Sequence, residues 1–293
     1  MKRFCIFCFV ACVFACVVFT GCDKEDDDFV VKASVTNGSA YNSKVDIVKA
    51  VVYPGENSLT ESAYKSGGFT IELPKTLADT YLGQFDEDYL QELNEFGIEV
   101  SDATAKSAAV YFEGYKSGSY FGDFILAKYE ENETETPNTY TMSYMAADAS
   151  YIYVDKNLSM KGSFNEKLSK EDILDLFDEE DIEMFDNFNF EIIVSHDNSL
   201  KKGWNILYEI MEQVLIVSFT SSGANANFKL TVTNTTKNPG GMKWYSDDEF
   251  YEMVYGDGDS KSYSPYSKAL KKFSLQPKNR FFSPPSRQTF FQK

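Results

Sequence analysis

The stretch YTMSYM, residues Tyr140–Met145, places Tyr, Met and Tyr at alternate positions with Thr and Ser between them. Side chains two positions apart on a β-strand point to the same face, so this alternation predicts a strand with one buried face. The same pattern recurs in Phe29–Val35, Val45–Tyr53, Phe69–Leu73, Ala109–Phe112, Tyr120–Tyr129, Tyr151–Val154, Phe188–Val194, Trp204–Tyr208, Val214–Phe219 and Phe228–Val232. We therefore expect a mainly β fold, an antiparallel β-sandwich or barrel-like body.

Two short helices are expected to interrupt the strands. Asp86 can cap a helix that ends at Gly97 and carries Leu90, Leu93 and Phe96 on one face. A capping-box pattern begins at Ser169, with the acid of Ser169-Lys170-Glu171-Asp172 at the third position, and apolar residues at helical spacing follow it. A boundary at this second helix divides the body into residues 29–165 and 166–255, the latter being either a second domain of helix and strands or a continuation of the same sheet.

The N-terminus has the layout of a secretory signal peptide, residues 1–21. Lys2 and Arg3 precede an apolar run from Phe4 to Phe19, which is short for a membrane-spanning helix. All five cysteines lie at or before Cys22, so the mature chain keeps at most one thiol and has no disulfide framework. An apolar core must therefore stabilise the fold.

Gly21 followed by Cys22 resembles the lipobox of bacterial lipoproteins, in which cleavage between these two residues leaves an acylated cysteine at the new N-terminus. Phe19 stands where that family usually has Leu. The resemblance implies that Cys22 carries the lipid and that acyl chains attach the protein to a membrane. An ordinary signal peptide, or an uncleaved anchor, is the alternative.

An acidic linker, residues 22–28, follows the lipid-attachment position. It contains the run Lys24, Glu25, Asp26, Asp27 and Asp28. This run resembles the short export signal of Bacteroidetes-type lipoproteins, and the resemblance implies an outer-membrane, lipid-anchored protein that faces the cell exterior. If the run is only a solvated spacer, the protein faces the periplasm instead.

Three motifs resemble a group of uncharacterised Bacteroidetes-type surface lipoproteins with an acidic linker and a β-rich body. They are the GGF-x-I-x-LP strand ending at Pro74, the KKGWN segment Lys201–Asn205, and the stretch Met242–Tyr245. The resemblance covers roughly residues 1–246 and brings no established activity with it.

Charge restricts the partners. The net charge of −17 repels phosphate backbones, so we expect no nucleic-acid partner. The C-terminal tail, residues 256–293, differs from the rest: it has eight basic and two acidic residues and half of the eight prolines. Its composition predicts disorder, unless the tail is an artefact at the end of the gene.

Signals for catalysis, cofactors and metals are weak. His196 is the one histidine of the chain, and the segment Ser195–Asp197 is expected to form a turn, because triad members meet in space and not as sequence neighbours. Asp257 begins a stretch like a calcium loop, but Lys268 stands where the loop needs Glu. We therefore predict no enzyme, no cofactor and no metal site. A hydrolase, the least favoured alternative, requires a cleft with two close carboxylates, one of raised pKa.

Aromatic residues make up 16% of the chain and suggest a binding surface. Tyrosines on the predicted strands can either present flat rings to a ligand or fill the core, and they are Tyr111, Tyr115, Tyr120, Tyr140, Tyr144, Tyr151 and Tyr153. Trp204 and Trp244 are the best single candidates for ligand contacts. The sequence thus favours a non-catalytic binding module for glycan or protein ligands. The alternative is a structural or assembly subunit of an envelope complex or surface fibre.

Overall fold

The computed structural model describes residues 29–53, 57–85, 87–168, 185–221 and 223–255. The signal peptide, the lipid-attachment and export residues 21–28, the helix expected at Ser169 and the tail 256–293 lie outside these residues. The strands are β1 (Phe29–Ser34), β2 (Ile47–Tyr53), β3 (Asn57–Ala63), β4 (Gly68–Leu73), β5 (Gly83–Gln84), β6 (Glu99–Val100), β7 (Lys106–Lys116), β8 (Ser119–Thr136), β9 (Thr139–Val154), β10 (Leu158–Leu168), β11 (Asn187–Leu200), β12 (Gly203–Phe219), β13 (Ala224–Thr235) and β14 (Lys243–Ser246). The mainly β prediction is confirmed.

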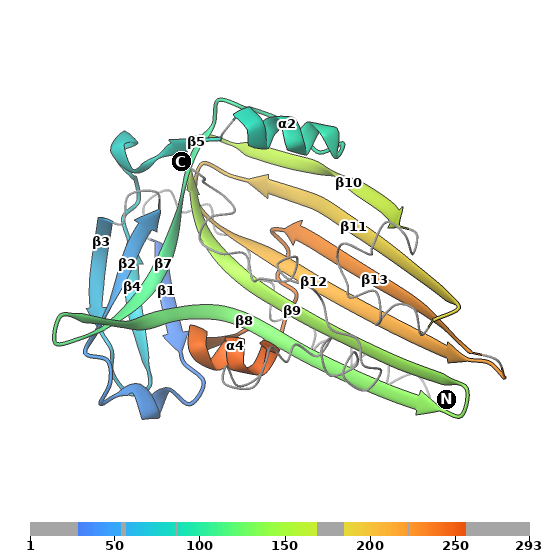
Figure 1. Cartoon of the computed structure of the whole chain (residues 1–293). Coiled ribbons are helices and arrows are strands. Elements are labelled where there is room, and N and C mark those ends of the chain that lie inside the picture. The colour runs from blue at the N-terminus through green and yellow to red at the C-terminus, as the bar shows by residue number, and fades with distance from the viewer. Residues whose placement is uncertain (1–28, 54–56, 86, 169–184, 222, 256–293) are drawn as a thin grey trace, which may run out of the picture.

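Twelve of these strands form one large sheet, and β1 and β4 form a second sheet of two strands (Figure 1). The large sheet runs β3-β2-β7-β8-β9-β12-β13-β11-β10-β6, with β14 beside β8 and β5 beside β7. This path is open, with β3 and β6 at its two ends. Strands on both sides of the expected boundary near residue 166 therefore belong to one sheet.

The two sheets form a sandwich at one end of the molecule. β1 and β4 pack across β2, β7 and β14, and buried aromatic rings fill the space between the layers. Phe69 of β4 contacts Phe112 of β7 and Trp244 of β14, with ring centroids 5.7 and 5.3 Å apart. The long strands β8 to β13 extend away from this sandwich (Figure 1).

The long strands β9 and β12 each join two segments that the sequence pattern separates, and β12 contains both Trp204–Tyr208 and Val214–Phe219. Tyr140–Met145 and Tyr151–Val154 lie in the single strand β9, which pairs with β12 along nearly its whole length. The residues between them are small or acidic but include no Gly or Pro, so nothing ends the strand. Side-chain alternation is interrupted there, so the sequence pattern showed two separate segments.

One strand pairing differs from the antiparallel expectation. β11 and β12 are joined at Lys201 and Lys202 and then diverge, and β13 lies between them, parallel to β11 and antiparallel to β12. The turn is closed by Asn205, whose side chain accepts from the Lys201 N–H and donates to the Lys201 carbonyl. Gly203 there has φ 100, which favours glycine. The KKGWN motif therefore forms the turn after which β11 and β12 diverge on either side of β13.

Helix α2 (Glu87–Glu95) is the helix expected after Asp86, and Gly97 ends it with φ 69 while the Ile98 N–H donates to the Leu93 carbonyl. Asp86 itself lies outside the described residues. Helix α4 (Asp247–Tyr255) was not predicted. Its sequence signal is the capping box Ser246–Glu249, in which the Ser246 hydroxyl accepts from the Glu249 N–H. No helix within the described ranges is long and apolar enough to cross a membrane.

The GGF motif forms a tight turn against the first 3-10 helix, η1 (Gly38–Tyr41). Lys65 and Gly68 exchange backbone hydrogen bonds across Ser66 and Gly67, which both have positive φ. A Cβ on Gly68 would lie 2.0 Å from the Ala33 carbonyl oxygen, so only glycine fits there. The glycines of the motif are therefore required by close backbone packing in the sandwich.

Candidate functional site

The predicted lipid-attachment, cleavage and export residues all lie outside the described part of the chain. They are Gly21, Cys22, Lys24, Glu25, Asp26, Asp27 and Asp28. Their roles stay predictions.

Trp244 is a core residue. Its side chain is 6% exposed and packs between Phe69, Phe112 and Tyr151, with the Tyr151 ring stacked 6.1 Å away at an interplanar angle of 22°. Strand β14 places it there by pairing with β8, which turns the indole into the sandwich. The prediction that Trp244 presents its ring to a ligand is wrong, because β14 is an internal part of the core and not a rim.

Trp204 is half-buried at the edge of the same sandwich. Its indole N–H donates to the Pro74 carbonyl at 2.8 Å, and its ring lies 5.4 Å from Tyr153 in an edge arrangement. These contacts join the start of β12 to the end of β4. The polar group of Trp204 is thus already engaged within the protein, and ligand binding by its remaining exposed surface stays a prediction.

Most strand tyrosines are also buried and do not form an aromatic platform. Among those proposed for binding, Tyr140, Tyr144, Tyr151 and Tyr153 are each 6% exposed or less. Tyr111 and Tyr115 are half-buried, and Tyr120 is 52% exposed, with its hydroxyl donating to Asp123. The core alternative that was left open for these tyrosines holds for the four buried ones.

The large sheet has two different faces beyond the sandwich. Strand register assigns residues to faces, because cross-strand partners point the same way. Helix α4 packs on one face, against Ala127 and Ile125 of β8, and we call this the helix-bearing face. The other face is covered by β1 and β4 at the sandwich end, but along β10, β11, β12 and β13 many of its side chains are exposed. We call this second part the open face.

The open face carries a polar lattice. Side chains on the parallel strands β11 and β13 meet their direct partners: Asn187 donates to Asn225, Asn189 donates to Asn227, Ser195 donates to Thr233, and Lys229 pairs with Glu191. These contacts hold the exposed side chains in fixed positions. The lattice is therefore an ordered polar surface.

Strand β12 carries a stripe of aliphatic side chains next to the polar lattice of β11 and β13. Ile216 is 36% exposed, and Val214 and Ile210 are half-buried on the same face. Glu212 interrupts the stripe, opposite Met145 of β9. An apolar stripe bordered by ordered polar groups is the composition of a protein interaction surface. The sequence of β12 already indicated this stripe, because it places apolar residues on both faces of the strand and not on one face alone.

A row of polar side chains crosses the helix-bearing face. Strand register places Asp148 of β9 opposite Glu209 of β12, Glu209 opposite Asn234 of β13, and Asn234 opposite His196 of β11. The next row on the same face is apolar, with Met211 and Val232 among its members. The row lies near Thr235, where β13 ends between the diverging strands. We call these four residues the polar row.

The carboxylates of the polar row have raised pKa values. Burial is the largest cause and raises the pKa of Asp148 to about 7, with a further contribution from the negative charge of Glu209. Burial likewise raises the pKa of Glu209. Both side chains are half-buried. Within the described residues, neither forms an ion pair.

Several buried polar atoms on this face have no hydrogen-bond partner among the residues that the structure describes. They are His196 Nδ1, Asn198 Nδ2 and Oδ1, Gln213 Oε1 and Asn234 Oδ1. Each such group costs about 1–3 kcal/mol when it is left unsatisfied, so their accumulation on one face calls for an explanation. Sequence reasoning missed this set because its members belong to three strands and only the register brings them together.

His196 does not lie in a turn. β11 continues through Leu200, and the imidazole points to the helix-bearing face while Ser195 and Asp197 point to the open face. The expectation of a turn was wrong, because β11 is extended by pairing with both β10 and β13. A Ser-His-Asp arrangement of these neighbours is excluded by the same alternation. Burial lowers the pKa of His196.

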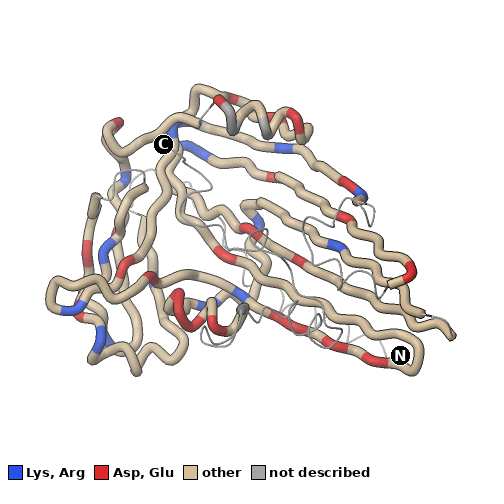
Figure 2. The backbone as a smooth tube through the Cα atoms, viewed as in Figure 1, with Lys and Arg blue, Asp and Glu red and all other residues tan. Residues whose placement is uncertain are grey.

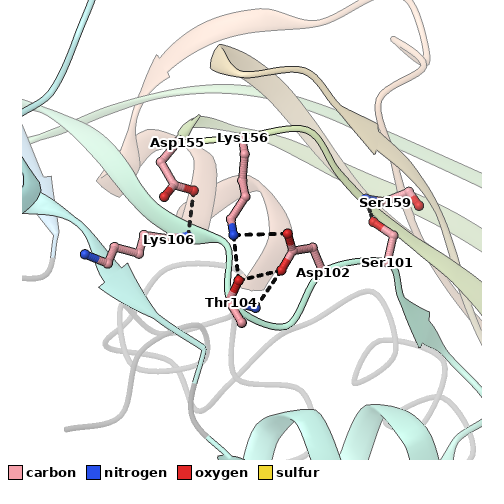
Figure 3. Close-up of polar contacts among 7 residues, drawn as sticks. All are labelled: Ser101, Asp102, Thr104, Lys106, Asp155, Lys156 and Ser159. Atoms are coloured by element: carbon pink, nitrogen blue, oxygen red, sulfur yellow. Dashed lines mark hydrogen bonds and ion pairs between the residues drawn. The ribbon is translucent and has the colours of Figure 1, made fainter.

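A third cluster of polar side chains, separate from the polar lattice and the polar row, joins two loops near the start of β10 (Figure 3). Lys156 donates to Thr104 at 2.6 Å and pairs with Asp102 at 3.0 Å, and Asp102 also accepts from the Thr104 backbone and hydroxyl. The hydrogen bond from the Thr104 hydroxyl is the largest cause that lowers the pKa of Asp102, and with the hydrogen bonds from Lys156 and the Thr104 backbone it brings this pKa to about 2. Asp155 accepts from the Lys106 N–H beside them. All these groups are satisfied by one another, so the cluster holds the loops together.

A shallow groove of about 410 Å³ lies beside the Ser66–Gly67 turn, between the ends of β1, β3 and β4. Its lining includes the buried Ser62 hydroxyl, which has no hydrogen-bond partner among the described residues, but no carboxylate or histidine. The Asp148–Glu209 pair is therefore not part of this groove. In the described ranges, no three His, Cys, Asp or Glu side chains gather into a metal-binding group.

Comparisons of the chain with protein-family models, with curated proteins and with solved structures find no match.

Proposed function

We propose that the protein is a lipid-anchored, non-catalytic binding module of the outer membrane, and that its ligand is another envelope protein bound on the open face. The observation that carries this proposal is the aliphatic stripe of β12, with Ile216 36% exposed, next to the polar lattice of β11 and β13. Interfaces combine such an apolar centre with a polar rim.

A protein ligand is favoured over a glycan. Glycan recognition was expected to use exposed aromatic rings, but Trp244 and the strand tyrosines Tyr140 and Tyr144 are buried. The exposed strand positions of β11 and β13 on the open face carry Asn, Ser, Thr, Lys, Ile and acidic residues instead. Aliphatic side chains at half exposure bury well against a protein partner.

The open face can be tested with a photo-crosslinking residue at Val214 in intact cells. We expect a discrete crosslinked species with one envelope protein, and we expect Ile216→Lys to abolish it by placing a charge in the stripe. Thr70, exposed on β4 of the two-stranded sheet, is the matched control, both as a crosslinker position and as Thr70→Lys. Equal crosslinking from positions 70 and 214 would contradict the proposal.

A structural or assembly subunit is the second candidate. β10 pairs with β11 on one side, but on its other side β6 covers only Met160 and Lys161. Among the described strands, the outer edge from Ser163 to Leu168 therefore has no ladder partner and can accept a strand of another chain. A proline at Asn165 would block such addition, while the stripe variant Ile216→Lys would leave it intact.

Surface display rests on the acidic run after Cys22. Protease treatment of intact cells should cleave the native protein but spare a variant in which Lys24–Asp28 is replaced by neutral residues. Protection of both proteins would place the binding module in the periplasm. A Cys22→Ser variant should be recovered in the soluble fraction if Cys22 carries the acyl chains.

A further inference from the structure

The polar row contains a pair of like charges that the described residues do not neutralise. Asp148 and Glu209 are direct cross-strand partners, so their Cβ atoms lie about 5 Å apart on one face. Like charges in this position destabilise a sheet. Lysines form six ion pairs elsewhere in the described chain, but none with these two residues. A positively charged species from outside the described residues is needed to keep both carboxylates ionised.

The neighbouring residue of the row points to a cation as that species. Asn234 is 5% exposed and is the direct partner of Glu209 on the strand opposite to Asp148. Its side-chain oxygen Oδ1 is buried and accepts no hydrogen bond from the described part of the chain. The side chains of Asp148, Glu209 and Asn234 thus occupy adjacent positions on three adjacent strands. The oxygen atoms of all three can coordinate a cation.

We propose that Asp148, Glu209 and Asn234 bind one hard divalent cation of the calcium type on the helix-bearing face. Carboxylate and amide oxygens are the ligands that Ca²⁺ prefers, at about 2.3–2.6 Å. Strand spacing of about 4.8 Å lets Asp148 and Asn234 reach toward a point above the central Glu209. Water completes the six to eight oxygens that Ca²⁺ requires.

His196, which carries the nitrogen donor of the polar row, lies too far from Glu209 to be a ligand of the same cation. His196 is one strand beyond Asn234, about 10 Å from Glu209 at the usual strand spacing. An oxygen-only set disfavours zinc, which takes nitrogen and sulfur ligands. The site lies on the face opposite to the open face, so it does not depend on the proposed protein ligand.

Calcium titration of the full chain in detergent tests this site, with CaCl₂ as the probe and isothermal calorimetry as the readout. We expect one Ca²⁺ to bind at or below about 1 mM, the range of extracellular calcium modules. Asp148→Asn should weaken binding at least about tenfold, and Asn234→Ala by a smaller factor, because each removes one ligand. Glu212→Gln, on the same strand but on the opposite face, should leave the affinity within about twofold of the native value.

Thermal unfolding in EDTA separates loss of the site from loss of the fold. Asp148→Asn should unfold at or above the native temperature without Ca²⁺, because it removes the like-charge repulsion. It should also lose the rise in unfolding temperature that Ca²⁺ gives the native chain. The proposal is overturned if the native chain binds no Ca²⁺, if Asp148→Asn binds it as tightly as the native chain, or if Glu212→Gln weakens binding equally.

Discussion

Gly38 and Gly67 meet so closely that a Cβ on Gly38 would lie 2.2 Å from the carbonyl oxygen of Gly67. Gly38 begins η1 and Gly67 lies in the turn before β4, and the Gly67 N–H donates to Asn42 just after η1. Tyr64 adds a hydrogen bond from its hydroxyl to the Gly38 carbonyl. The backbone of the GGF turn therefore packs directly on the backbone of η1.

Gly38→Ala should destabilise the protein by about 2–4 kcal/mol, because the two backbone segments must separate to admit the methyl group. Urea denaturation followed by tryptophan fluorescence measures this loss. Gly118→Ala is the control for backbone strain without close packing, since Gly118 has a positive φ of 84, which Gly38 lacks, and nothing lies within 4 Å of its added Cβ. It should cost only about 1–2 kcal/mol. Equal losses would show that close packing is not the cause.

Trp244→Ala should cost about 3–5 kcal/mol, because it removes a large ring that is 6% exposed in the sandwich core. Ligand binding should be lost only as far as the fold is lost. Trp204→Phe should cost about 0.5–1.5 kcal/mol by removing the hydrogen bond to Pro74. Calorimetric unfolding of both variants checks this order, and a milder effect for Trp244→Ala would contradict the assignment of Trp244 to the core.

Stability should fall as the pH rises from about 4 to about 7 in calcium-free buffer. Burial raises the pKa of Asp148 to about 7 in the folded state, whereas an unfolded Asp ionises near pH 3.9. Between these values the folded state keeps a proton that the unfolded state has lost, so rising pH favours unfolding. Urea midpoints across this range should slope downward in the native chain and flatten in Asp148→Asn.

The opposite slope is expected below about pH 4. Hydrogen bonds from Thr104 and the charge of Lys156 lower the pKa of Asp102 to about 2, so its contribution is lost as the pH falls toward that value. Asp102→Asn should therefore reduce the acid sensitivity without changing the slope near neutrality. A change near neutral pH in this variant would argue against Asp148 as the source.

Ser246→Ala should cost about 1 kcal/mol by removing the N-cap of α4. The Ser246 hydroxyl accepts from the Glu249 N–H and also contacts Tyr41. Far-ultraviolet circular dichroism and urea denaturation check the loss. Ser246→Asp, which can still cap the helix, should recover most of the stability. Failure of Asp to recover it would show that the Tyr41 contact matters more than the cap.

The β content and most strands could be predicted from residues with clear alternation. Segments such as Phe188–Val194 and Phe69–Leu73 have one apolar and one polar face, and their strands formed as expected. β3 was missed because its sequence, NSLTESA, has few apolar residues and pairs at a sheet edge. β10 was missed for the same reason, since most of its second half is exposed.

The candidate sites were harder to predict than the elements. Trp244 looked like a surface residue because MKWYS gives no sign that β14 enters the core beside β8. The polar row could not be found from the sequence, because residues 148, 196, 209 and 234 are joined only by strand register. Acidic side chains are also abundant elsewhere, as along the outer half of β8, so composition does not single out Asp148 and Glu209 (Figure 2).

The position of β13 between β11 and β12 has a consequence for biosynthesis. β11 and β12 leave the ribosome before β13, yet they have no partner on their facing edges until Ala224–Thr235 has been made. Chains that end before residue 224 should therefore expose two long edges and aggregate or be degraded. Strand β13 therefore completes this half of the sheet by pairing with β11 on one side and with β12 on the other.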